Sequence, residues 1–141
     1  MWKIAERLKA YEATRKKSSG KELPPAFLVI AKLRPYFTTL MGNAGFRALL
    51  ARALALAGTE VKWLRQVQVT TTGTLQMPAR LGRLGPEELN QGGTLLIVEL
   101  LSLLVAFIGE KLTLQMIRDV WPKMPLRDLD FYEGDKNEET K

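Results

Sequence analysis

Acid–base chemistry in this chain would have to come from carboxylates, lysines or tyrosines, because its 141 residues include neither cysteine nor histidine. The lack of cysteine excludes disulfides, thiolate nucleophiles and thiolate ligands for zinc or iron–sulfur clusters. The lack of histidine removes the most common general base and the most common metal ligand. We therefore predict a protein that is not an enzyme and that binds no cofactor or metal.

The sequence motifs agree with this prediction. There is no Walker loop, no dinucleotide-binding glycine fingerprint, no EF-hand loop and no GxSxG elbow. Glu99 lies in a strongly apolar run, where burial would raise its pKa and make it a candidate general acid or base. An exposed position explains this glutamate better, and an ion pair with Arg47, Arg52 or Arg118 is the next alternative.

Charge is divided unequally along the chain. Residues 1–84 contain fifteen Lys and Arg against four Asp and Glu, a net charge of +11, whereas residues 85–141 carry −5. This division indicates either that the two halves attract each other or that a basic face binds an anionic partner. The candidate contacts for such a partner are the basic residues of the N-terminal segment and of the 78–85 loop: Lys3, Arg7, Arg15, Lys16, Lys17, Arg80 and Arg83.

The N-terminal segment is predicted to form a basic amphipathic helix over residues 2–17. Ile4, Leu8 and Tyr11 have the i, i+4, i+7 spacing of one helical face, and basic residues including Lys9 occupy much of the remainder. The apolar face is too narrow to favour membrane binding. Residues 18–25 are small and polar and then Pro-Pro, which predicts a linker.

The most apolar stretch, residues 94–121, should form two helices, over 94–108 and 110–121, that meet at Gly109. As a single helix, the sixteen residues 94–109 would measure about 24 Å, which is short of the roughly 30 Å hydrocarbon core of a bilayer. Glu99 near the middle would add to the cost of insertion. We therefore expect the core helix of a soluble, cytoplasmic domain. Glu99, Ser102 and Ala106 lie near one line of this helix, which marks either a close helix contact or an edge open to a partner.

The remaining core elements are predicted between residues 26 and 93. We expect a helix over 26–40 with a kink or break near Arg34, before Pro35, and a stop at Gly42. A second helix over 44–57 would have Asn43 as N-cap and Gly58 as C′ residue. A short helix within 59–66 follows, and alternation over 66–77 leaves a β-hairpin or a loop open. Pro86 should begin a helical turn that Gly92-Gly93 interrupts.

These segments predict an all-α fold, a compact bundle of about five helices. Whether residues 66–77 form a small β-hairpin or a loop stays open. One domain would cover residues 1–132, with a core at 26–121 and a segment at 122–132 tethered by Leu126, Leu129 and Phe131. Residues 133–141 contain no apolar side chain and are expected to be disordered.

The function that best fits these observations is a non-catalytic protein–protein interaction module, such as an adaptor or a small regulatory subunit of a bacterial cell. Its partner would be another protein or a second copy of the chain, and no small-molecule substrate is evident. The same ten candidate contact residues, the seven basic ones and the three apolar ones of the tail, would form its binding surface. The alternative is a nucleic-acid-binding protein that uses the N-terminal helix and the 78–85 loop.

Overall fold

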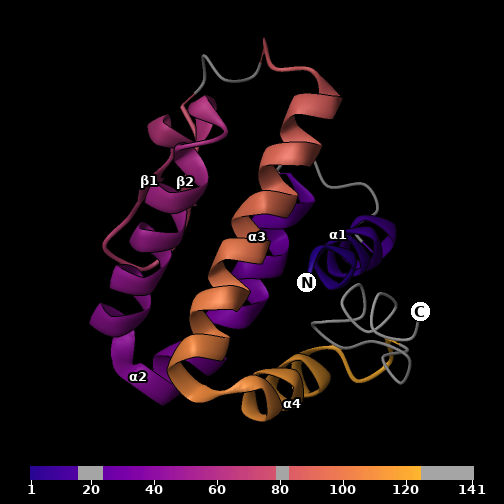
Figure 1. Ribbon diagram of the computed structural model, residues 1–141, viewed down its shortest axis with the longest axis vertical. Helices are drawn as coiled ribbons and strands as arrows, with labels where there is room; N and C mark the ends of the chain where they lie inside the picture. The colour runs from indigo at the N-terminus through magenta and orange to yellow at the C-terminus, as the bar shows by residue number, and fades with distance from the viewer. Residues whose placement is uncertain (16–23, 79–82, 125–141) are drawn as a thin grey trace, which may run out of the picture.

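The computed structural model describes residues 1–15, 24–78 and 83–124, and it confirms the all-α fold with a small hairpin (Figure 1). The prediction of five helices becomes four because two of them join. The elements in chain order are α1 (Trp2–Arg15), α2 (Pro25–Gly58), a 3₁₀ helix η1 (Lys62–Gln66), β1 (Gln68–Val69), β2 (Leu75–Gln76), α3 (Pro86–Ile108) and α4 (Glu110–Val120).

α2 consists of two limbs, residues 25–41 and 43–58, joined at Gly42. This glycine has φ 82° and ψ 162°, a conformation that L-residues with a side chain rarely adopt. The limbs correspond to the two helices that the sequence predicts here, and Figure 1 shows them running in different directions.

Two expectations about α2 are wrong. The helix continues through Pro35 with helical dihedral angles, so the break lies at Gly42 and not near Arg34. Pro35 is exposed, so water can bind the carbonyl that proline leaves without a donor. Gly58 is the last residue of α2 rather than the C′ residue, and its carbonyl accepts a hydrogen bond from Arg65 Nε at 2.9 Å.

The hairpin is confirmed as a pair of two-residue antiparallel strands. Gln68 pairs with Gln76 and Val69 with Leu75, and the turn between them places Gly73 at φ 82°. The Asn43 side chain donates to the carbonyl of Thr71 at 3.1 Å, which ties the turn to the second limb of α2.

The sequence predicts a helical turn that begins at Pro86, and α3 does begin there. The helix then continues without interruption to Ile108, a total length of 23 residues. The expectation that Gly92-Gly93 ends this turn is wrong. A Cβ added at Gly92 would lie 2.5 Å from the Trp63 ring, and one at Gly93 would lie 2.7 Å from Ala26 Cβ. Both glycines therefore serve close packing against η1 and α2 rather than a helix end.

The full length of α3 also corrects the argument against a membrane span. Its 23 residues measure about 35 Å, and by length and composition α3 can cross a membrane, a test that the core helices of soluble proteins pass as well. In this fold α3 lies between α1 and the second limb of α2, with the first limb behind it (Figure 1). Its buried apolar residues belong to the hydrophobic core: Leu96, Ile97, Leu100, Leu101 and Leu104.

The line of polar and small residues on α3 faces outward. Ser102, Ala106 and Gly109 are exposed and Glu99 is half-buried. The sequence left two alternatives for this line, a close helix contact or an open edge, and in the structure it is an open edge. The close helix contact of α3 lies instead at Gly93. Gly109, with φ 95°, then separates α3 from α4 as expected.

The close contact at Gly93 gives a direct test of this packing. Alanine has a higher helix propensity than glycine by about 1 kcal/mol, yet we expect Gly93→Ala to lower the free energy of unfolding by about 1–3 kcal/mol, the usual cost of overpacking. Urea unfolding measures the difference. Gln91→Ala is the control, because Gln91 is exposed in the same turn of α3. An unchanged or higher stability of Gly93→Ala would contradict the packing described.

Candidate functional site

Lys9 is the most unusual polar residue in the structure, because its side chain is buried between α1 and α3. The sequence pattern placed it among the exposed basic residues, and this is wrong: Lys9 is 5% exposed. Its Nζ donates to the backbone carbonyl of Asn90 at 2.8 Å, to Asn90 Oδ1 and to Thr94 Oγ1. These three acceptors match the three N–H bonds of an ammonium group.

The surroundings of Lys9 indicate a structural role. Burial lowers the pKa of Lys9 below its usual 10.5, and the charge of Glu6 partly raises it again. A lysine with a lowered pKa can act as a nucleophile or base, but here all three donors are used within the protein. Lys9 lines none of the grooves among the described residues. The hydrogen bonds therefore hold α1 against α3.

A second buried polar contact holds the end of α4. Glu12 on α1 accepts a hydrogen bond from Trp121 Nε1 at 2.7 Å and forms an ion pair with Lys32 at 3.2 Å. Both Glu12 and Trp121 are almost fully buried. The three residues come from α1, from α2 and from the residue that follows α4, so one carboxylate fixes three elements. Sequence reasoning missed Glu12, although Ala5, Lys9 and Glu12 have helical i, i+4, i+7 spacing.

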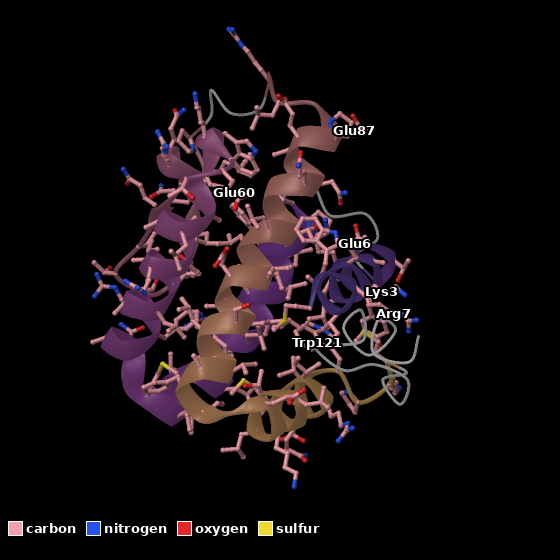
Figure 2. All side chains as sticks on the ribbon, in the orientation of Figure 1. Lys3, Glu6, Arg7, Glu60, Glu87 and Trp121 are labelled. Atoms are coloured by element: carbon pink, nitrogen blue, oxygen red, sulfur yellow. The ribbon has the colours of Figure 1, made fainter. Side chains whose placement is uncertain are left out.

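The predicted basic surface is only partly placed by the structure. Lys3 and Arg7 are exposed on α1, where they line a groove together with Glu6 (Figure 2). Arg83 is exposed just before α3, and Figure 2 shows Glu87, at the start of α3, well away from Lys3 and Arg7. The structure therefore does not bring Arg83 to the two basic residues of α1.

The other predicted contact residues lie outside what the structure describes. Arg15 is the last residue of α1, but its side chain is not among the described ones. The remaining predicted contacts, and the tail at 133–141 that was expected to be disordered, fall in the undescribed ranges: Lys16, Lys17, Arg80, Leu126, Leu129 and Phe131.

Exposed apolar side chains gather at one end of the molecule. Five large apolar residues of the described chain are between 41% and 65% exposed: Trp2, Tyr36, Leu40, Phe107 and Leu112. All but Trp2 come from segments near Gly42 and Gly109, and Figure 1 shows the bend of α2 and the α3–α4 turn at the same end. We call Tyr36, Leu40, Phe107 and Leu112 the apolar end. Sequence reasoning missed this surface, because each of its residues fits a buried helical face equally well.

A groove runs into the apolar end between α2 and α4. It has a volume of about 520 Å³, and its lining consists of Pro35, Tyr36, Thr39, Leu40, Met116 and Asp119. Leu112 lies one helical turn before Met116 and therefore on the same side of α4. The Tyr36 hydroxyl donates to the Asp119 carbonyl at 3.5 Å, which links the two walls.

A larger groove, of about 780 Å³, lies between the second limb of α2 and the segment from η1 to β1. We call it the alanine groove, because its α2 wall is made mainly of alanines. Leu54 and Leu64 are buried in its floor. The charged residues of its lining are both arginines. The full lining is Ala44, Arg47, Ala48, Ala51, Leu54, Ala55, Leu64, Arg65, Val67, Gln68 and Val69.

Neither a metal site nor a known relative assigns a function to these surfaces. Within residues 1–15, 24–78 and 83–124, no group of three or more Asp and Glu side chains is placed to hold a metal ion. No family model, curated protein or solved structure matches the chain. The candidate functional sites are therefore the apolar end and the alanine groove.

The lowered pKa of Lys9 predicts a pH dependence of stability. Between the pKa of Lys9 in the folded protein and 10.5, the unfolded chain binds more protons than the native protein, so unfolding becomes less favourable as the pH rises. We expect the free energy of unfolding of the wild type to increase relative to Lys9→Met over this window, as measured by urea unfolding at several pH values.

Lys3→Met is the control for that measurement, because Lys3 is exposed on the same helix. It measures the effect of removing a lysine of α1 that is not buried. A difference between the wild type and Lys9→Met that does not change with pH, or that changes equally in Lys3→Met, would show that burial does not lower the pKa of Lys9.

Proposed function

We propose that the protein is a non-catalytic protein–protein interaction module, an adaptor or small regulatory subunit, and that it binds a partner protein through the apolar end. The observation that carries the proposal is the exposure of Tyr36, Leu40, Phe107 and Leu112, which come from segments at one end of the molecule. Exposed apolar residues next to a groove are characteristic of interaction sites, since their contact with water is unfavourable.

The charges around the apolar end favour a protein over a bilayer as the occupant. Glu110 and Lys111 are both exposed between Phe107 and Leu112 in sequence, and Asp119 lines the groove. Charges of both signs are costly to bury in a bilayer, whereas a protein partner can pair with them. Five apolar residues of α3 are buried in the core, which suits a module that works in the cytoplasm.

Binding to nucleic acid has weaker support. The described basic residues of the two predicted segments are not gathered, and Glu6 lines the groove that holds Lys3 and Arg7. Single-strand binding also uses aromatic side chains interleaved with basic ones, which this groove offers only in Tyr11. Nucleic-acid binding therefore stays the alternative function.

Position-specific crosslinking tests the proposed function. A photo-crosslinking amino acid at Leu40 or at Leu112 should each give a discrete adduct with another polypeptide in cells that make the protein. The same amino acid at Ala31, which is exposed on the same limb of α2 as Leu40 and lines neither groove, should not. Adducts with lipid, with a second copy, or equally at Ala31 would overturn the proposal.

The crosslinked partner then permits a quantitative test with purified proteins. We expect Leu40→Glu to weaken binding by about tenfold or more, because it places a charge within an apolar contact. Ala31→Glu introduces the same charge outside the apolar end and should bind like the wild type. Circular dichroism verifies that both variants fold.

A further inference from the structure

The part of the sequence that supplies the alanine groove is strongly basic. Between Leu23 and Pro86 the sequence contains eight Lys and Arg, and its single acidic residue is Glu60. Glu60 follows α2 and is absent from the groove lining. The groove itself is lined by apolar residues, Gln68 and two arginines, and no acidic residue is part of its lining.

We propose that the alanine groove is a second docking surface and that it binds an acidic amphipathic helix of a partner protein. It is independent of the apolar end, since no residue is common to the two linings and the groove lies along the second limb of α2, beyond Gly42. A module with two separate surfaces can hold two partners together, which is the work of an adaptor.

The two arginines of the groove have donors available for a carboxylate. Arg65 Nε is bonded to the Gly58 carbonyl, which orients the side chain, and Arg47 Nε is buried without a hydrogen bond in the structure described. A guanidinium carries five N–H donors, four of them on the two Nη atoms. Within the part of the chain that the structure describes, none of these four donors is used on either arginine, so both are able to bind carboxylates bidentately.

The shape of the groove favours a helix over an extended strand. Ala44, Ala48, Ala51 and Ala55 follow the i, i+4, i+7, i+11 spacing of one helix face, so the α2 wall is low along about three turns. Low walls let a second helix approach closely, because interaxial distance depends on the side chains at the contact. The opposite wall includes β1, which has two residues and so offers too short an edge for strand addition.

The same lining disfavours other occupants. Two copies joined groove to groove would bring Arg47 and Arg65 of both chains together, and like charges at an interface are unfavourable. A nucleic-acid backbone would meet the arginines but leave the Leu54 and Leu64 floor uncovered. The lining also has no aromatic residue for base stacking.

A peptide selection tests this proposal. A displayed library of random peptides, about three to five helical turns long, is selected against the purified full chain. Enriched peptides should carry Asp and Glu on one helical face and apolar residues at i, i+3, i+4 and i+7, and their affinity should fall as salt is added. Enrichment of neutral or basic sequences would overturn the proposal.

Matched variants locate the binding of the selected peptides. We expect Ala51→Trp, which fills the groove, to weaken binding by about tenfold or more, while Ala31→Trp binds like the wild type. The double variant Arg47→Gln/Arg65→Gln keeps polar, though shorter, side chains, removes both charges and should also weaken binding and reduce its salt dependence. If Ala51→Trp does not fold, the double variant alone tests whether the selected peptides bind in the alanine groove.

Two further measurements separate this surface from others. Leu40→Glu, at the apolar end, should leave peptide binding unchanged, so the two proposals can fail independently. Duplex DNA should not displace the selected peptide. Displacement by DNA, or full binding to the Arg47→Gln/Arg65→Gln variant, would contradict an acidic-helix site.

Discussion

At Gly92 and Gly93 the backbone of α3 lies against the Trp63 ring and Ala26, closer than any side chain would permit. One turn of helix around the same point, from Asn90 to Thr94, supplies every acceptor for the buried ammonium of Lys9. A buried charge is tolerated when such partners are in place. Close packing and hydrogen bonding thus fix α1, α2 and η1 on the same part of α3.

The position of α3 determines which surfaces remain open. Its buried apolar side chains, from Leu96 to Leu104, belong to the core that α3 shares with α1 and α2, although Phe107 stays exposed. Apolar residues stay exposed near the points where the chain turns, at Gly42 and Gly109, and the Glu12–Trp121 hydrogen bond ties the far end of α4 to α1. The alanine groove forms because the hairpin is tied to α2 through Asn43.

Much of the fold could be predicted from local sequence signals. Periodicity located the helices, Gly42 and Gly109 located the breaks, and alternation located the hairpin. The sequence-based predictions were wrong where one residue type can have either of two structural roles. Gly92-Gly93 looks like a helix stop but permits close packing, and Lys9 looks like a surface charge but finds buried acceptors far along the chain. The apolar end and the alanine groove depend on which helix faces are covered, and no local pattern determines that.

Residues 96–104 of α3 contain five buried apolar side chains of the core, and we propose that this segment is the most stable part of the fold. Native-state hydrogen exchange in detergent-free buffer tests it most directly. Amides buried in the most stable part of a fold exchange only through global unfolding, so the amides of 96–104 should exchange more slowly than those of α4 and of the hairpin. Exchange of 96–104 as fast as that of α4, or a protein that stays dissolved only in detergent, would contradict the account.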